Sequence, residues 1–386
     1  MNSMSNMVRE KRILVLYTGG TMGMKPDANG SLAPSKGYLT ERIMELPEIG
    51  RDDMPHFKVK EYDELIDSSC MGPQHWICIA NDIESNYNAY DGFVVIMGTD
   101  TMAYASSALS FMLENLSKPV VFTGSQIPFA QVYTDARRNL LVAMIVAATS
   151  DFPEVCLCFN DKILRANRTV KMNSIGLDAF DSPNYHPLAT LGTSIRQRKD
   201  LVLCHPKGEF TVSHNLDAKV IVIKLVPGFD DESISALVKH STSLKAIVLE
   251  MYGTGNGPSK KLPLLDAIRL ARSKGIVVVA LSQCARGGVS LETYSMGRDF
   301  SNAGVISGGD MTTEACTTKL AYLCGKFTDM ESIIYYMSVN IRGELTEKGM
   351  SHLRTSSYQE SVVPTPTVRS TESSGVFANL SSQNDL

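Results

Sequence analysis

Residues 13–23 read ILVLYTGGTMG, a short apolar run that leads directly into a turn with two adjacent glycines. A continuous apolar run that ends in glycine is typical of a strand buried on both faces of a parallel sheet. The turn after it carries two hydroxyls, Thr18 and Thr21. It therefore has two explanations: a tight connection in which Thr21 satisfies backbone groups, or a loop that presents a nucleophile.

Similar apolar runs recur through the first half of the chain and alternate with segments of helical periodicity. The predicted strands are Ile13–Tyr17, Val59–Tyr62, Phe93–Met97, Val120–Thr123 and Val155–Phe159. The predicted helices between them are Trp76–Tyr87, Met102–Leu116 and Asp135–Ala148. Because parallel strands need a crossover connection, which is usually a helix, this alternation predicts an α/β fold with a parallel sheet.

A second, shorter α/β series follows a region of irregular pattern at residues 201–218. Its predicted strands are Val220–Val226, Ala246–Glu250, Ile276–Leu281 and Val305–Ser307. We therefore expect a larger N-terminal parallel-sheet domain with the catalytic loops at 1–200, a connector at 201–218, and a smaller C-terminal α/β domain at 219–354. Residues 355–386 are rich in Ser and Thr and lack apolar periodicity, which predicts a disordered tail.

Composition and charge exclude several classes of protein. The 386 residues are 44% hydrophobic and 20% charged, and a formal net charge of -4 gives no electrostatic reason to expect nucleic acid or an anionic membrane as partner. There is no run of 18 apolar residues and no signal-peptide core, so we expect a cytoplasmic protein without a membrane span. The eight cysteines lack zinc-site spacing and are expected to be free thiols.

Four loops that follow predicted strands carry hydroxyls, glycines or carboxylates. They are TGGT at 18–21, DSS at 67–69, GTDT at 98–101 and TGSQ at 123–126. Since ligands bind at the carboxyl ends of the strands in open parallel sheets, we expect these loops to meet at one edge. None of them contains histidine, so a hydroxyl nucleophile needs another base, for which Lys171 is the candidate.

Each loop taken alone also has a purely structural explanation. Thr99, Asp100 or Thr101 would serve as the N-cap of the helix that follows them. Ser68 and Ser69 would serve as solvated loop residues. The catalytic interpretation rests on four separate loops that bring the same chemistry to one predicted edge.

These motifs resemble those of the L-asparaginases, specifically the cytosolic bacterial-type (type I) group. The similar segments are YTGGTMGM, DSS, GTDTMAYASSALSFMLENL, TGSQIP, NRTVK, YGTGNGP, GIVVV, GVISGGDMT and RGELT. They extend over roughly residues 10–350, and TGGT together with GTDT is the most specific combination. The resemblance implies a large N-terminal and a smaller C-terminal α/β domain. It also implies a homodimer or homotetramer with active sites at subunit contacts, and an enzyme without a metal or organic cofactor.

The resemblance further implies catalytic roles for four residues. Thr21 matches the family's primary nucleophile, and Thr99, Asp100 and Lys171 match its second Thr–Asp–Lys set. The implied reaction is hydrolysis of L-asparagine to L-aspartate and ammonia through a threonyl ester. We expect Lys171 to hydrogen-bond Thr99 and to tune that hydroxyl or a water held by it. Discrimination against glutamine by about one methylene is worth only ~1–3 kcal/mol, which leaves room for weak glutaminase activity.

A second set of residues is implied to bind the substrate. Asp67, Ser68 and Asp100 match the positions that bind the α-amino and α-carboxylate groups, and Ser69 lies beside them. Asn256, in GTGNG, is a weaker candidate for a contribution from a neighbouring subunit. A zwitterionic substrate needs an anion and hydrogen-bond donors close together, and these carboxylates and hydroxyls supply both.

Three positions depart from the family's pattern. Ser31 or Leu32 stands near the place of a tyrosine that assists the first threonine, and Tyr38 is the nearest tyrosine downstream. Met97 stands where histidine is common, and Cys70 stands where aspartate is usual. The sequence therefore leaves open whether a tyrosine assists the nucleophile.

Three other functions compete with this interpretation. An amidotransferase subunit that supplies ammonia to a partner acting on tRNA should carry an additional N-terminal domain, and the first strand here begins at Ile13. A protein that only binds or senses an amino acid would keep the fold without turnover. A dinucleotide loop at YGTGNGP would need an acidic residue at the end of the next strand, and Ile276–Leu281 has none.

Overall fold

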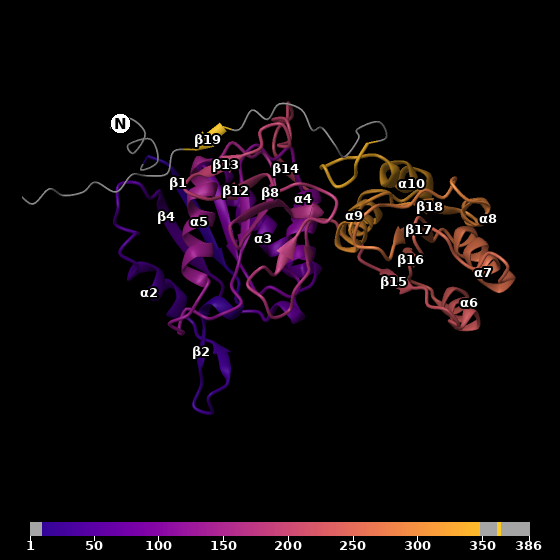
Figure 1. Ribbon diagram of the computed structural model, residues 1–386, viewed down its shortest axis with the longest axis horizontal. Coiled ribbons are helices and arrows are strands. Elements are labelled where there is room, and N and C mark those ends of the chain that lie inside the picture. The colour runs from indigo at the N-terminus through magenta and orange to yellow at the C-terminus, as the bar shows by residue number, and fades with distance from the viewer. Residues whose placement is uncertain (1–9, 348–360, 364–386) are drawn as a thin grey trace, which may run out of the picture.

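The structure is a computed structural model that describes residues 10–347 and 361–363. Figure 1 shows two α/β domains side by side, a larger one formed by the N-terminal half and a smaller one formed by the C-terminal part of the chain. The predicted fold class, a larger N-terminal parallel-sheet domain and a smaller C-terminal α/β domain, is confirmed. No helix in the described ranges is long and apolar enough to cross a membrane.

Within the described residues, the large sheet has nine strands in the order β19-β13-β12-β9-β8-β7-β5-β1-β4. Its parallel half contains the predicted strands: β1 (Arg12–Tyr17), β4 (His56–Glu61), β5 (Gly92–Ile96), β7 (Val120–Thr123) and β8 (Val155–Phe159). The antiparallel half was not predicted and consists of β9 (Lys162–Arg165), β12 (Ala189–Leu191), β13 (Ile195–Gln197) and β19 (Ser361–Val363). These strands are too short to show a clear apolar period.

Two helical layers cover the two faces of the large sheet. In β1, Leu14 and Leu16 point into the core beneath α3 (Pro73–Asn86) and α4 (Met102–Met112). Ile13 and Val15 point into the opposite core, beneath α2 (Tyr38–Met44) and α5 (Ala136–Thr149). Because these side chains are buried on one face or the other, the run is continuously apolar.

The predicted helix Met102–Leu116 is wrong at its carboxyl end. The helix α4 ends at Met112, because Leu113–Glu114 forms the short strand β6 and pairs with β14 (Thr211–Val212). Asn115 then adopts φ 54°, a left-handed conformation that no helix can continue through. The strand β14 lies inside the predicted connector, so part of this connector is tied to the large domain.

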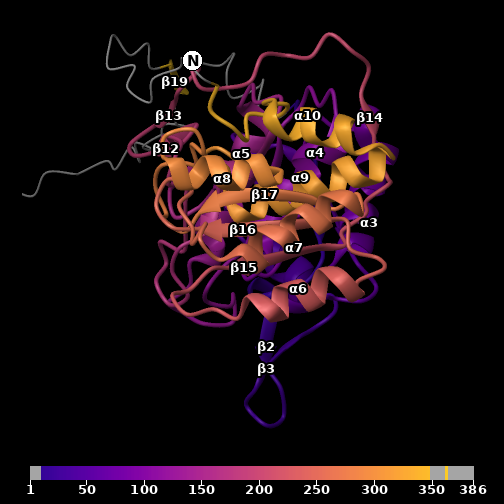
Figure 2. The same cartoon turned by 90° about the vertical axis from the view of Figure 1, so that its right-hand side faces the viewer.

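The smaller sheet contains β15 (Val220–Lys224), β16 (Ala246–Met251), β17 (Val277–Ser282) and β18 (Val305–Ser307), all parallel and in sequence order. All four match predicted strands. One face packs on α6 (Asp231–His240), α7 (Leu262–Ser273) and α8 (Ser295–Ala303), which face the viewer in Figure 2. The other face packs on α9 (Thr313–Lys326) and α10 (Met330–Ser338).

The two domains meet through buried side chains of α4 and α9. Phe111 of α4 belongs to the core formed by α9 and α10, and the Ser107 and Thr318 hydroxyls lie 2.8 Å apart. The Arg168 guanidinium of the large domain also pairs with Asp310 of the small one at 2.9 Å, and both side chains are almost fully buried. The relative placement of the domains is therefore fixed by packing and by a buried ion pair.

Three smaller features complete the fold. The hairpin β2 (Met24–Pro26) and β3 (Leu32–Pro34) projects from the large domain in Figure 1, and β10 (Val170–Lys171) pairs with β11 (Phe180–Asp181). In the predicted tail at 355–386, the described strand β19 pairs with β13, whose unpaired backbone groups offer an edge for an added strand. The rest of that tail lies outside the described residues.

Candidate active site

The candidate site lies where the strand order of the large sheet reverses. From β1 the chain passes to β4 on one side, and it then returns to β5 on the other side of β1. The loops that follow β1 and β5 therefore flank a topological switch point, where open parallel sheets bind ligands. The four polar loops predicted from the sequence follow β1, β4, β5 and β7.

Close backbone contacts bring three of these loops together. Gly20 has φ 91°, and a Cβ built on it would lie 2.2 Å from the Gly98 nitrogen. A Cβ built on Gly98 would lie 2.6 Å from the Ser68 hydroxyl. Only glycine allows both approaches, so the glycines hold the TGGT, DSS and GTDT loops in mutual contact.

Thr99, Asp100 and Lys171 form one hydrogen-bonded cluster. The Lys171 ammonium donates to the Thr99 hydroxyl at 2.8 Å and to the Asp100 carboxylate at 2.5 Å. Thr99 is buried and the Lys171 side chain is mostly buried, whereas 65% of the Asp100 side chain is exposed. The cluster thus presents a held hydroxyl and a paired charge at the surface of the sheet edge.

Gln126 also belongs to this cluster, although nothing in the sequence singled it out beyond its place in TGSQ. The Thr99 hydroxyl donates to the Gln126 carbonyl oxygen at 3.2 Å, and the Gln126 amide donates to the Gly176 carbonyl at 3.1 Å. Gln126 therefore fixes the direction of the Thr99 proton and ties the loop after Lys171 to the sheet. Its position directly after a predicted strand was the available signal.

The N-cap explanation for the GTDT hydroxyls is not supported by the geometry. Thr101 occupies the N-cap position of α4, but no side-chain capping hydrogen bond is made there. Its hydroxyl instead donates to the Ser68 carbonyl at 2.6 Å. The Thr99 hydroxyl is occupied by Gln126 and Lys171, so these side chains connect loops and do not cap the helix.

Asp67, Ser68 and Ser69 form a compact turn next to this cluster. One Asp67 carboxylate oxygen accepts from the Ser69 amide at 2.8 Å and from the Ser69 hydroxyl at 2.7 Å. The hydroxyl and then the amide bond of Ser69 lower the pKa of Asp67 below its ordinary value, so this carboxylate is ionised at neutral pH. The buried Ser68 hydroxyl accepts from the Asp100 amide at 3.3 Å.

Thr21 begins a short 3-10 turn, Thr21–Gly23, directly after Gly20. Its side chain is half-buried, and among the described residues its hydroxyl makes no hydrogen bond to protein. Tyr38 begins α2, and its ring lies under the Lys25 ammonium of the β2–β3 hairpin at 5.5 Å. In the described part of the chain, no hydrogen bond joins Tyr38 to Thr21.

Asn256 is not brought to this cluster within the chain. It lies in the small domain after β16 and forms an isolated bridge with Tyr252. The amides of Gly255 and Asn256 both donate to the Tyr252 carbonyl, at 3.1 and 2.8 Å. These two N–H groups are already used inside the turn and are not available to a dinucleotide phosphate.

Comparison with known families gives two matches that together cover most of the chain. Residues 12–203 match the family model described as "Asparaginase, N-terminal". Residues 219–337 match the family model described as "Glutaminase/Asparaginase C-terminal domain".

Individual relatives agree with these matches. The chain is 45% identical to L-asparaginase 1 of Escherichia coli (strain K12) over 339 residues, which covers 88% of this chain and 99% of the relative. The crystal structure of L-asparaginase I from Vibrio cholerae is similar with a TM-score of 0.81 and 42% identity, covering 88% of this chain and all of that one. The thermostable L-asparaginase from Thermococcus kodakarensis gives a TM-score of 0.79 and 36% identity, with 87% and 99% covered. The chain therefore belongs to the asparaginase family of amidohydrolases.

Proposed function

We propose that the protein hydrolyses the side-chain amide of L-asparagine and releases L-aspartate and ammonia. The observation that carries this proposal is the bond of one mostly buried ammonium, that of Lys171, to both the Thr99 hydroxyl and the Asp100 carboxylate at the switch point of the sheet. The names of the similar proteins supply the substrate, because the relatives from E. coli, V. cholerae and T. kodakarensis are L-asparaginases.

In the proposed mechanism, the Thr21 hydroxyl oxygen attacks the carbonyl carbon of the side-chain amide. The tetrahedral intermediate collapses with cleavage of the C–N bond, and the nitrogen takes up the proton that the Thr21 hydroxyl gives up and leaves as ammonia. A water molecule then hydrolyses the threonyl ester, which releases L-aspartate and restores Thr21. No described residue hydrogen-bonds the Thr21 hydroxyl, which supports this role because the oxygen is free to approach a substrate.

Lys171 and Thr99 are proposed to manage protons and water during these steps. The Thr99 oxygen accepts from Lys171 and directs its own proton toward Gln126, so it is held in one orientation. A held hydroxyl of this kind positions a water molecule for attack on the ester more effectively than a mobile one. The N-terminus of α4, which follows immediately, adds partial positive charge where the oxyanion develops.

The substrate's charged head is proposed to bind at the turn formed by Asp67, Ser68 and Ser69, with Asp100 beside it. The Asp67 carboxylate, held ionised by Ser69, supplies the anion for the α-ammonium group. Ser68 lies against the Gly98 backbone and so joins the head site to the reacting loops. Asparagine and glutamine carry the same charged head and differ by about one methylene, which is worth ~1–3 kcal/mol of discrimination between them. We therefore propose weak glutaminase activity.

We also propose that the enzyme acts as a homo-oligomer in the cytoplasm, in which Asn256 of a neighbouring subunit completes the site. Asn256 lies outside the cluster in its own chain. Exposed apolar side chains in the loops next to the site, among them Val132, Tyr133 and Ile175, offer a surface for a second copy. All eight cysteines are free thiols, in keeping with a reducing compartment.

Ammonia release from L-asparagine by the Lys171→Met variant tests the proposal. We expect kcat to fall at least about a hundredfold, because an ammonium that orients a reacting hydroxyl is lost. Lys162→Met is the matched control, since Lys162 also pairs with an aspartate, Asp181, at 3.2 Å but lies outside the cluster. Wild-type turnover in the Lys171 variant would remove this residue from the mechanism. Binding of L-asparagine by the wild type without ammonia release would instead favour a sensor.

A further inference from the structure

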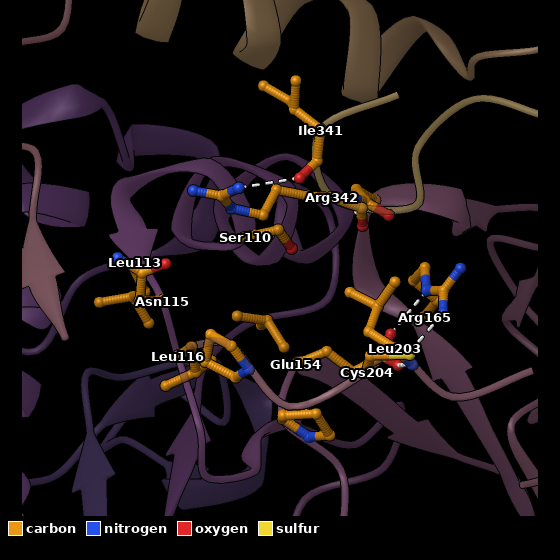
Figure 3. A pocket seen from close by; sticks show the side chains of 14 residues that line it. Ser110, Leu113, Asn115, Leu116, Glu154, Arg165, Leu203, Cys204, Ile341 and Arg342 are labelled. Atoms are coloured by element: carbon orange, nitrogen blue, oxygen red, sulfur yellow. Dashed lines mark hydrogen bonds and ion pairs between the residues drawn. The ribbon is translucent and has the colours of Figure 1, made fainter. Parts of the chain in front are cut away.

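A second pocket lies at the junction of the two domains, at the end of the large sheet opposite the candidate active site. Its volume is about 180 Å³, and Figure 3 shows Ser110, Glu154 and Arg342 among the side chains of its walls. Glu154 is already satisfied by two bonds from Arg165, at 2.6 and 3.2 Å. No residue of the Thr99 cluster lines this pocket. The attacking water of the proposed reaction must therefore be positioned by the cluster itself.

Within the cluster, a backbone carbonyl fixes the orientation of the Gln126 amide. Its Nε2 donates to the Gly176 carbonyl at 3.1 Å, and its Oε1 accepts from the Thr99 hydroxyl at 3.2 Å. A carbonyl oxygen can only accept, so the amide nitrogen has to face Gly176 and the amide oxygen has to face Thr99. The backbone N–H of Gln126 donates to the Asp135 carboxylate at 3.1 Å and holds the residue from its other end. Gln126 is therefore an acceptor, and not a donor, toward Thr99.

The loop that carries the Gly176 carbonyl is held as well. The Asn173 side-chain oxygen accepts from the amides of Ile175 and Gly176, at 3.0 and 2.9 Å. The loop leaves β10 directly after Lys171 and returns to β11, which pairs with β10. One short hairpin thus positions both the Lys171 ammonium and the carbonyl that orients Gln126.

These contacts use up most of the hydrogen-bonding capacity of Thr99. A threonine hydroxyl has one proton and two lone pairs. The proton is directed to Gln126, and one lone pair accepts from Lys171 at 2.8 Å. One lone pair is left. Thr99 can therefore make one more hydrogen bond, and in that bond it is the acceptor.

The direction of this last bond matters for a water molecule that attacks the threonyl ester. A water that donates to Thr99 keeps its own lone pairs for the acyl carbon. A water that accepts from Thr99 has one of these lone pairs occupied. Without Gln126, the Thr99 proton would be free to rotate toward the water, so Gln126 favours the productive orientation.

We propose that Gln126 is a positioning residue for the second half of the reaction, in which the threonyl ester is hydrolysed. This inference rests on the proposed function. The water donates a hydrogen bond to Thr99, its oxygen attacks the acyl carbon, and the bond from that carbon to the Thr21 oxygen breaks. One water proton ends on the Thr21 oxygen, and the other is released when the product carboxylic acid ionises. Gln126 acts on this step through Thr99.

The proposal predicts a specific kinetic signature for Gln126→Met, which keeps the length of the side chain but lacks the amide. The rate constant of ester hydrolysis should fall on the order of tenfold to a hundredfold, because the water is less well oriented. This step then limits turnover, so kcat and KM fall together. The ratio kcat/KM stays at the wild-type value, because it depends only on the steps up to formation of the ester. A merely structural role of Gln126 would lower kcat/KM as well.

Rapid-quench measurement of ammonia release from L-asparagine, with mass spectrometry of the quenched protein, tests the proposal. Gln126→Met should release a burst of about one ammonia per active site and then turn over slowly, with an aspartyl adduct on Thr21. Gln126→Glu keeps an acceptor oxygen for Thr99 and should accumulate less adduct. Gln74→Met, at an exposed position of α3, is the matched control and should behave as the wild type.

The outcomes separate this inference from the proposed function. If the wild type releases no ammonia from L-asparagine, both are overturned. If the wild type is active and Gln126→Met turns over at the wild-type rate, or loses kcat and kcat/KM equally without an adduct, this inference alone is overturned. Gln126→Ala, with the same expected signature, replaces the methionine variant if that variant does not fold by circular dichroism.

Discussion

Replacing Asp310 with asparagine should destabilise the junction between the two domains. Arg168 comes from the large domain and Asp310 from the small one, and their side chains are 2% and 8% exposed. The introduced amide would keep the shape of the side chain and one acceptor oxygen, which in the native protein receives the Thr346 amide at 2.9 Å. The substitution would remove the charge that faces Arg168, and a guanidinium cannot escape by losing its proton.

The magnitude follows from this burial. Breaking a buried ion pair by removing one partner costs about 3–5 kcal/mol, because the other charge is left uncompensated. For a chain of this size that free energy corresponds to a decrease of about 4–7 °C in Tm. Urea denaturation and differential scanning calorimetry of the Asp310→Asn variant measure both quantities.

A control at an exposed pair separates burial from charge. Asp266 pairs with Arg269 at 2.8 Å on α7, and these side chains are 70% and 53% exposed. Asp266→Asn should change stability by no more than about 1 kcal/mol, as expected for a surface pair. Equal losses in the Asp266 and Asp310 variants would refute the argument that burial makes the domain-joining pair strong.

Three more tests address pH dependence, the glycine contacts and the proposed subunit contribution. Burial opposes ionisation of Asp310, but the charge of Arg168 and the bonds from Thr346 outweigh it and lower the pKa of Asp310. Because the pKa of Asp310 is lower in the folded than in the unfolded state, its ionisation stabilises the fold fully when the pH is above the unfolded-state pKa. This stabilisation is lost as the pH falls through the folded-state pKa. Wild-type urea midpoints should therefore drop more steeply below about pH 4 than those of Asp310→Asn. Gly20→Ala should abolish most ammonia release, because its Cβ would meet the Gly98 nitrogen. Gly30→Ala should lose little activity, because Gly30 has a similar φ of 81° but a Cβ built on it would have no atom within 4 Å. Comparable losses in the two variants would show that backbone strain alone is responsible. Asn256→Ala should raise KM for L-asparagine several-fold without changing the fold by circular dichroism, and an unchanged KM would remove Asn256 from the site.

The sequence predicts the parallel strands well because burial on both faces leaves continuous apolar runs. The run of β1 is the clearest case, since its residues divide between two cores. The antiparallel half of the large sheet is hidden because its strands have only three or four residues. In β12 and β13 buried positions also mix with exposed ones, at Thr190 and Arg196. The early end of α4 depends on pairing between β6 and a distant segment, which no local pattern encodes.

The candidate site, too, could be predicted from the sequence only in part. Thr99, Asp100 and Lys171 could be grouped from the sequence because each lies in a recognisable motif, and in the structure they share hydrogen bonds. Gln126 was not selected, since a loop amide carries no period or charge that marks it. The second pocket could not have been predicted, because it is formed by segments that are far apart in the sequence and meet only where the domains pack.

The most direct test of the proposed chemistry is ammonia release from L-asparagine by the wild type, Thr21→Ala and Thr99→Ala under identical conditions. If two threonine hydroxyls and one lysine perform the hydrolysis, each variant should lose at least about 10²–10³ in kcat while still binding L-asparagine. Turnover at the wild-type rate in either variant would contradict the account.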